Sequence, residues 1–253
     1  MSRIHKKTFF FDSVTSTQDK ALELLDKHPS AAVLVFANQQ TQGRGQLQRT
    51  WKSAPGGSVL CTLALTGETV PAAHWEGLYW KLALYTHQFL NHQFSFPEQT
   101  LKIKWPNDLY FKNKKLGGLL IELAWQGTQL QTLRIGFGLN LHPGPETWNF
   151  PAAFINELTN TAQNAQQIAD NWAEFVLKEL TAPLTSKPLL LHEYELSLLG
   201  FQEWKSYTLN SHTQNLKITG IDSMGNLVLT DMLNNRITPS HTSINWDWLQ
   251  SEN

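Results

Sequence analysis

The sequence has one cysteine, almost no net charge and no long hydrophobic run. Cys61 alone cannot form an intramolecular disulfide or a multi-cysteine zinc site, and the apolar run at 59–65 around it is typical of a buried side chain. The 20 lysines and arginines nearly balance the 21 aspartates and glutamates, which leaves no electrostatic footprint for general nucleic-acid binding. No apolar run could span a bilayer, and the run at 9–11 meets Asp12 too early for a signal peptide. We therefore expect a soluble, cytoplasmic protein with no nucleic-acid partner and no membrane partner.

Length and patterning divide the chain into two parts. The 253 residues are 41% hydrophobic and 16% charged, which is enough apolar material for a large domain together with a small one. After Gly200 the pattern changes to short strands, expected at 204–209, 216–221, 227–230 and 234–237, with a turn at 223–226. This pattern favours a small all-β domain of barrel type. We predict domains at 1–199 and 200–253.

The first part mixes strand and helix signals. Apolar runs predict strands at 9–11, 32–37, 58–66, 102–105, 109–111, 119–121 and 129–135. Helical spacing predicts helices at 73–94, 162–180 and 189–199, and a further one that Ser16 or Thr17 caps. Capping residues at a strand-to-helix junction also face the mouth of a sheet, where small ligands bind.

The segment 104–122 is typical of a hairpin with lysines at its tip. The residues at 106–108 interrupt the first strand, and a polar turn at 112–115 carries three lysines. The returning strand is expected to open with Gly117 and Gly118, which let a ligand or another backbone come close. A solvated hairpin with exposed lysines explains the same residues without any ligand.

A long polar segment at 38–51 follows the buried strand at 32–37. Its backbone N–H groups can form an anion-binding concavity, and Arg44 and Arg49 add charge for a phosphate or a carboxylate. It lacks the Lys-Ser/Thr pair of a P-loop and the third glycine of a dinucleotide fingerprint. An exposed loop without function is the alternative. A glycine-rich turn at 136–141 is expected to present the Asn140 amide at a strand end.

Four motifs, taken together, resemble those of the biotin protein ligases. They are Gly43-Arg44-Gly45 with Arg49 and Trp51, Lys104-Trp105-Pro106-Asn107-Asp108, Lys115-Leu116-Gly117-Gly118, and Gly136-Phe137-Gly138-Leu139-Asn140. Ser16 and Thr17 fall where that family has its Ser-Thr pair, so the resemblance covers nearly the whole chain. It implies an α+β fold: a mixed β-sheet with helices packed on it, of the biotin/lipoate protein ligase and class II aminoacyl-tRNA synthetase-like kind, followed by a small SH3-like β-barrel.

The resemblance implies a two-step ligase. Biotin and ATP with Mg²⁺ would give biotinyl-5′-AMP, and the biotinyl group would pass to a lysine of the biotin carboxyl-carrier protein of acetyl-CoA carboxylase. Because the first step brings negative groups together, the site needs fixed positive charge and N–H donors more than a strong base. By similarity, Lys115 bridges the biotin carboxylate and the α-phosphate, and Arg44 is the second catalytic residue. The 43–51 loop would fold over the ligand and exclude water.

The resemblance also assigns the remaining site residues. For biotin they are Ser16, Thr17, Gln18, Gln40, Gly43, Arg44, Gly45, Gln46, Lys115, Gly117, Gly118 and Gly136. For ATP they are Arg44, Arg49, Trp51, Lys104, Asn107, Asp108, Lys115 and Asn140. No protein cage for a metal is expected, and Mg²⁺ would arrive with ATP near Asp108 and Asn140.

The chain departs from the family pattern at two places. Gln46 stands where some members have arginine, which implies a working ligase that holds its adenylate less tightly; Gln18 stands where many have asparagine. Only fifteen residues precede Ser16, so a short form without a DNA-binding domain is expected. Two alternatives stay open: a lipoate or octanoate ligase, which would lack the 43–51 loop, and a non-catalytic biotin-binding adaptor. Monomer and homodimer are both compatible with the sequence.

Overall fold

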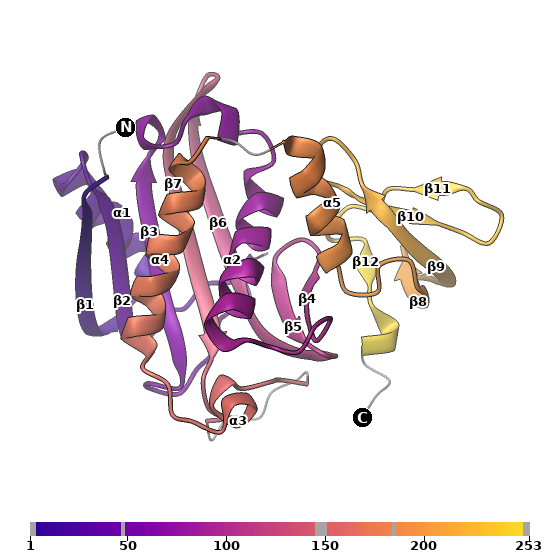
Figure 1. The fold of residues 1–253 in the computed structure, drawn as a ribbon, viewed down its shortest axis with the longest axis horizontal. Coiled ribbons are helices and arrows are strands. Elements are labelled where there is room, and N and C mark those ends of the chain that lie inside the picture. The colour runs from indigo at the N-terminus through magenta and orange to yellow at the C-terminus, as the bar shows by residue number, and fades with distance from the viewer. Residues whose placement is uncertain (1–3, 47–48, 145–150, 184–185, 250–253) are drawn as a thin grey trace.

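The computed structural model describes residues 4–46, 49–144, 151–183 and 186–249, and its strands form two sheets (Figure 1). The seven-stranded sheet has the order β1-β2-β3-β7-β6-β5-β4. Its strands are β1 (Lys6–Val14), β2 (Ala32–Gln40), β3 (Ser58–Thr66), β4 (Leu101–Lys104), β5 (Asp108–Phe111), β6 (Lys114–Gln126) and β7 (Gln129–Asn140). The helices are α1 (Thr17–Lys27), α2 (Leu78–Phe94), α3 (Ile155–Thr159), α4 (Ala165–Thr181) and α5 (Lys187–Ser197), with short 3-10 turns at Gly67–Thr69, Ala72–His74 and Asp247–Leu249.

The seven-stranded sheet is mixed, as expected. β1 and β2 run parallel, and each of the other neighbouring pairs is antiparallel. Successive residues of β2 point to opposite faces: Leu34 and Phe36 join the main core, whereas Val33 and Val35 pack with α1. Helices α2 and α4 cover the main-core face (Figure 1). The sheet is therefore buried on both faces near β2, which explains why that strand is an unbroken apolar run.

The predicted turn at 136–141 is wrong, because this segment continues β7 to Asn140. Gly136 pairs with Thr62 of β3 and Leu120 of β6, and Gly138 pairs with Leu60 and Gly118. Pairing on both sides satisfies the backbone polar groups, so the sheet overrides the local preference of glycine for turns.

The 104–122 hairpin also differs in detail from its prediction. β6 begins at Lys114, so Lys115 lies within the strand and pairs with Tyr110, next to an irregularity in the β5–β6 register. Gly117 and Gly118 are consequently interior to the strand and do not open it. The tip of the hairpin is only the turn at 112–113. A lysine in a paired strand is held more firmly than one at a mobile tip.

The five-stranded sheet lies beside α5 (Figure 1). Its antiparallel strands are β8 (Trp204–Leu209), β9 (His212–Ile221), β10 (Leu227–Thr230), β11 (Arg236–Ile237) and β12 (Ile244–Asn245), in the order β11-β10-β9-β8-β12. The Trp105 indole N–H donates to the Gly225 carbonyl at 3.0 Å, and Glu195 of α5 accepts from the Ile221 N–H at 3.1 Å. These contacts attach the small sheet to α5 and to the turn that follows β4. The domain boundary at 199/200 remains a proposal.

The fold class expected from the sequence is confirmed by a mixed sheet with packed helices followed by a small antiparallel sheet. No helix within the described ranges has the length and the hydropathy to cross a membrane.

Candidate active site

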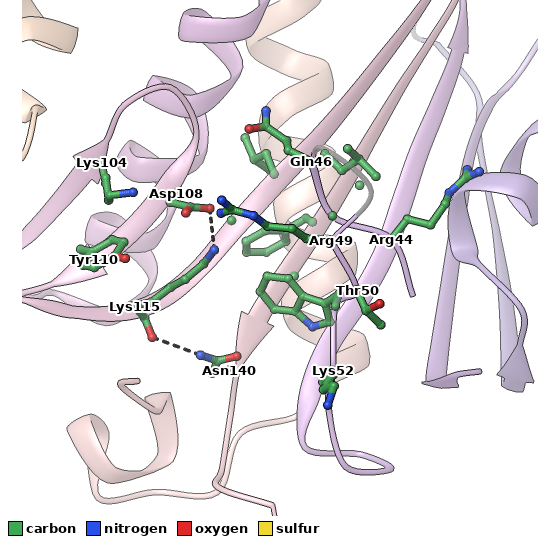
Figure 2. A pocket seen from close by; sticks show the side chains of 18 of the residues that line it. Arg44, Gln46, Arg49, Thr50, Lys52, Lys104, Asp108, Tyr110, Lys115 and Asn140 are labelled. Carbon is green, nitrogen blue, oxygen red and sulfur yellow. Dashed lines mark hydrogen bonds and ion pairs between the residues drawn. The ribbon is translucent and has the colours of Figure 1, made fainter. Parts of the chain in front are cut away.

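A cavity of about 1010 Å³ lies over β3, β6 and β7, and residues 44–46 and 49–52 and several residues of 241–249 complete its wall. Figure 2 shows part of this wall. Of the residues that the sequence assigned to a site, nearly all line the cavity. The exceptions are Gly43, Asn107 and Gly117. The structure thus brings together side chains from six separate places in the chain.

Three cations converge on Asp108 at one end of the cavity. The Lys115 ammonium lies 2.8 Å from the Asp108 carboxylate and 5.7 Å from the centre of the Trp51 ring. The side chains of Arg49 and Lys104 point toward the same carboxylate (Figure 2). Asn140 donates its amide N–H to the Lys115 carbonyl at 3.1 Å, which ties the end of β7 to the strand that carries the lysine. The predicted essential lysine is therefore a partly buried, braced cation.

The charge of the cavity wall is strongly positive, although the whole chain carries a net charge of −1. Asp108 is the one carboxylate among the described lining residues, against the cations Arg44, Arg49, Lys52, Lys104 and Lys115. The pKa of Lys104 is lowered, chiefly by burial; Asp108 opposes this, and Lys115 and Arg49 add to it. The lowered pKa thus reports chiefly the burial of the ammonium, which a single nearby carboxylate does not offset. A bound polyanion would add negative charge beside these cations.

The opposite end of the cavity carries hydroxyl and amide groups. Ser16 caps α1 by accepting from the Gln18 N–H at 3.3 Å, as the sequence predicted. The Thr17 hydroxyl donates to the Gln40 side-chain carbonyl at 3.0 Å and accepts from Thr62 at 2.9 Å. These bonds hold the amide and hydroxyl groups in one orientation.

Gln18 presents a buried acceptor without a partner. Its side-chain amide donates to the Leu120 carbonyl at 2.7 Å, which sets the orientation of the amide plane. The remaining oxygen, Oε1, is buried and has no hydrogen-bond partner among the residues that the structure describes. An unsatisfied buried acceptor costs about 1–3 kcal/mol, so a ligand N–H at this point would be favourable.

Residues 43–46 and 49–51 are hydrogen-bonded to each other beside the cavity, and this segment is called the arch below. The Trp51 N–H donates to the Gly43 carbonyl at 3.0 Å, and the Gly45 N–H donates to the Arg49 carbonyl at 2.7 Å. Gly43 does not line the cavity; a Cβ there would lie 2.6 Å from the Trp51 carbonyl oxygen, so its role is to close the arch. Residues 47 and 48 lie outside the described residues.

The structure separates the two predicted catalytic residues. Arg44 donates to Asp19 of α1 at 2.7 Å and lies 3.6 Å from Glu122. Its guanidinium points away from the Lys115 end of the cavity (Figure 2). Arg44 therefore contacts the α1 side of the cavity, and its part in catalysis remains a proposal.

The sequence analysis did not predict the C-terminal residues of the cavity wall. They are His241, Thr242, Ile244, Asn245, Trp246 and Leu249. The Lys104 ammonium lies 5.3 Å from the centre of the Trp246 ring, close enough for a cation–π contact. No motif signals these residues, because only the packing of the small sheet against β4 brings them to the cavity.

Asn107 and Gly117 are close to the cavity but act in the scaffold. Asn107 is 3% exposed, and its side chain donates to the Leu119 carbonyl across the β5–β6 pair. Gly117 faces β7, where a Cβ would lie 2.6 Å from the Gly138 carbonyl oxygen. Both residues therefore set the spacing of strands that carry the lining side chains.

Alanine at Gly117 and at Gly118 is expected to act differently. Gly117→Ala forces two paired strands apart, with an expected loss of roughly 1–3 kcal/mol in the free energy of unfolding. Gly118→Ala meets only the Asp108 carboxylate, at 2.7 Å, which can rotate away. We expect Gly118→Ala to lower the free energy of unfolding by less than about 1 kcal/mol, because the displaced Asp108–Lys115 ion pair is partly exposed. Urea unfolding of both variants checks this, and a larger loss at Gly118 would contradict it.

Two oxygen-bearing side chains of the cavity wall are of the kind that binds Mg²⁺. Asp108 offers a carboxylate, and the Asn140 side-chain oxygen is buried with no partner in the described part of the chain. Within that part no group of three or more histidine, cysteine, aspartate or glutamate side chains could hold a metal ion. Oxygen ligands suit Mg²⁺, which usually takes one or two protein groups and completes its shell with phosphates and water.

Comparison with known proteins finds a matching family and several similar proteins. The model of the biotin/lipoate A/B protein ligase family matches residues 10–140. The bifunctional ligase/repressor BirA of Bacillus subtilis is 28% identical over 231 residues, which are 87% of this chain and 68% of that protein. The biotin–[acetyl-CoA-carboxylase] ligase of Paracoccus denitrificans is 35% identical over 133 residues, 52% of this chain and 53% of that protein.

Among solved structures, the biotin protein ligase from Aquifex aeolicus in complex with biotin and ATP superposes with a TM-score of 0.70. The two chains are 22% identical, and the match covers 94% of this chain and 97% of that one. This likeness extends through the small sheet and confirms the fold. With the family match spanning the strands that build the cavity, the chain belongs to the biotin/lipoate A/B protein ligase family.

Proposed function

We propose that this protein is a biotin protein ligase, which joins biotin to ATP as biotinyl-5′-AMP and transfers the biotinyl group to a carrier-protein lysine. The observation that carries the proposal is one cavity with a buried, unpartnered amide oxygen at one end and three convergent cations at the other. The relatives named biotin–[acetyl-CoA-carboxylase] ligase support it. The structures of Aquifex aeolicus and Leishmania major ligases with biotin, ATP or biotinyl-5-AMP support the choice of ligands.

The polar end of the cavity fits the ureido ring of biotin. A ureido group offers two N–H donors and one carbonyl acceptor. Gln18 Oε1 is an acceptor in need of a donor within the described structure, and the hydroxyls of Ser16 and Thr17 lie on the same wall. A lipoyl or octanoyl group has no N–H to offer, so the cavity favours biotin over the substrates of the sister ligases.

The cationic end fits the carboxylate and the triphosphate. In the first step a biotin carboxylate oxygen attacks the α-phosphorus and the bond to pyrophosphate breaks. Lys115, Lys104 and Arg49 neutralise the negative groups that this step brings together, which is where such a site lowers the barrier. Asp108 holds Lys115 at 2.8 Å before substrate enters, so the arriving phosphates take over a cation that is already positioned. Mg²⁺ bound with ATP would add positive charge near Asp108 and Asn140.

The carrier protein is the second substrate. The name of the Paracoccus denitrificans relative points to the biotin carboxyl-carrier protein of acetyl-CoA carboxylase. The arch at 43–51 would cover the adenylate until that protein docks, which limits hydrolysis. Arg44, held by Asp19, would position the arch from the α1 side.

ATP–pyrophosphate exchange tests the proposed function. We expect exchange with biotin and none with lipoate, with octanoate or without an acid. The polar end of the cavity selects the ring, and the cationic end catalyses the step. Exchange with lipoate or octanoate alone would assign the chain to a sister activity. No exchange with any acid would favour a non-catalytic binding module.

A further inference from the structure

The transfer step requires that the acceptor amine lose a proton, which the adenylation step does not. The acceptor is a lysine amine, whose ordinary pKa of about 10.4 keeps it protonated and non-nucleophilic near neutral pH. The ammonium must lose a proton before its nitrogen can attack the biotinyl adenylate. A base in the cavity would raise the rate of this step by about 10²–10⁴-fold. The inference below rests on the proposed function.

Most titratable side chains of the described cavity wall are poor candidates for this base. Lys104 and Lys115 serve as cations toward the phosphates, and the carboxylate of Asp108 is bound by Lys115 at 2.8 Å. Burial raises the pKa of Tyr110, so its hydroxyl stays protonated. Burial also raises the pKa of the Cys61 thiol, and Lys52 is a further cation of the wall. Among the described lining residues, this leaves the imidazole of His241.

His241 lies where two cavities meet. A smaller hollow of about 450 Å³ shares Gln46, Trp105 and His241 with the large cavity. Its rim carries exposed apolar side chains, among them Trp125, which is 45% exposed. A lysine side chain that enters through this hollow passes the imidazole on its way to the adenylate.

The His241 ring packs on Trp105, and its nitrogen atoms are not used in hydrogen bonds within the described chain. The rings of His241 and Trp105 meet edge to face, with their centres 5.5 Å apart. Neither ring nitrogen of His241 hydrogen-bonds to another residue within the described chain. The contact with Trp105 therefore fixes the position of the ring without occupying the nitrogen atoms that would accept a proton.

Burial and the neighbouring cations favour the neutral form of the His241 imidazole. Burial lowers its pKa most, Lys104 of β4 and Arg49 of the arch lower it further, and Asp108 of β5 opposes them. A histidine whose pKa lies below its ordinary value is unprotonated at neutral pH and can take up a proton.

We propose that His241 is the general base of the transfer step. Its imidazole takes one proton from the acceptor ammonium, and the nitrogen lone pair then forms the C–N bond to the biotinyl carbonyl carbon. The C–O bond to the phosphate breaks, and its electron pair leaves with AMP. The second proton on the new amide nitrogen passes to solvent. His241 takes no part in adenylation, because that step removes no proton from a carboxylate.

The test separates the two half-reactions in His241→Gln, with His212→Gln as the matched control. His212 lies on β9 of the same sheet and contacts the Asn210 carbonyl, not the cavity. We expect unchanged ATP–pyrophosphate exchange in both variants, and a single-turnover transfer rate about 10²-fold lower in His241→Gln alone. In the unaltered protein the transfer rate should rise about tenfold per pH unit below the His241 pKa and then level. The His241→Gln variant should lack that plateau.

Hydroxylamine, an amine that is largely unprotonated near neutral pH, replaces the carrier protein in a second arm. Hydroxylamine needs no base, so the His241→Gln variant should consume biotinyl-5′-AMP with hydroxylamine as fast as the unaltered protein does. A loss of exchange, or an equal loss with hydroxylamine and with the carrier, would show a structural role and overturn the inference. An unchanged transfer rate would also overturn it. Absence of biotinyl-5′-AMP formation by the unaltered protein would instead overturn the proposed function.

Discussion

Replacing Lys115 by alanine is expected to lower the rate of biotinyl-5′-AMP formation by about 10³-fold or more. Removing one donor from a site that stabilises developing charge already costs about 10²–10³-fold, and Lys115 is the cation that the resemblance places between the two reacting groups. The structure adds that this cation is braced, by Asp108 at 2.8 Å and by the Asn140 bond to its carbonyl. Replacing a flexible lysine at a hairpin tip would lower this rate less.

The same variant should stay folded. The Lys115 and Asp108 side chains are 19% and 27% exposed, and partly exposed ion pairs contribute at most about 1 kcal/mol. Pyrophosphate exchange and thermal unfolding measure the two effects separately. Lys114→Ala is the matched control, since Lys114 is the exposed neighbour on the same strand and does not line the cavity. Exchange near the unaltered rate in Lys115→Ala would remove Lys115 from the catalytic site.

Replacing Trp172 by alanine is expected to lower the free energy of unfolding by about 3–5 kcal/mol. Trp172 of α4 is fully buried and stacks on Phe137 of β7, with ring centres 4.8 Å apart. Its indole N–H donates to Thr86 of α2 at 3.1 Å. The side chain thus joins two helices to the strand whose Phe137 lines the cavity. At roughly 2–4 °C per kcal/mol, the melting temperature should fall by about 6–20 °C.

Trp172→Phe separates packing from hydrogen bonding at this position. The phenyl ring keeps part of the stack on Phe137, and the Thr86 hydroxyl still donates to the Leu82 carbonyl at 2.9 Å. We therefore expect the phenylalanine variant to lose less than half as much stability as the alanine variant in urea unfolding. Equal losses would mean that the hydrogen bond, and not the packed volume, dominates.

Elements bounded by strong local signals were predicted closely from the sequence. β3 was expected at 58–66, β8 at 204–209 and β10 at 227–230, and all three have those bounds. In each case an apolar or alternating run is bounded by turn residues on at least one side, so the local pattern and the tertiary structure agree. Of the two caps that the sequence offered for α1, Ser16 and Thr17, the structure has Ser16.

The errors fall where long-range pairing overrides a local preference. Gly136 and Gly138 looked like turn residues, yet they lie between β3 and β6 with partners on both sides. Helix α2 begins at Leu78 although the apolar spacing starts at 73, because a 3-10 turn occupies Ala72–His74. The sequence signals both partner strands but not that they pair with 136–138, so only the assembled sheet decides the conformation of these glycines.

By itself the sequence determined the chemical content of the site: the hydroxyls and amides at 16–18, the arginines of the arch, and the lysines and carboxylate at 104–115. These are short motifs whose residue types follow from the charge of the groups they bind. The tertiary structure alone decided which of them meet. It gathered Lys104, Arg49 and Lys115 around Asp108, turned Arg44 toward Asp19, and added His241 and its neighbours from the small sheet. Those contacts join residues as far apart in the chain as Lys104 and Trp246, and such separations are set by packing and not by any local pattern.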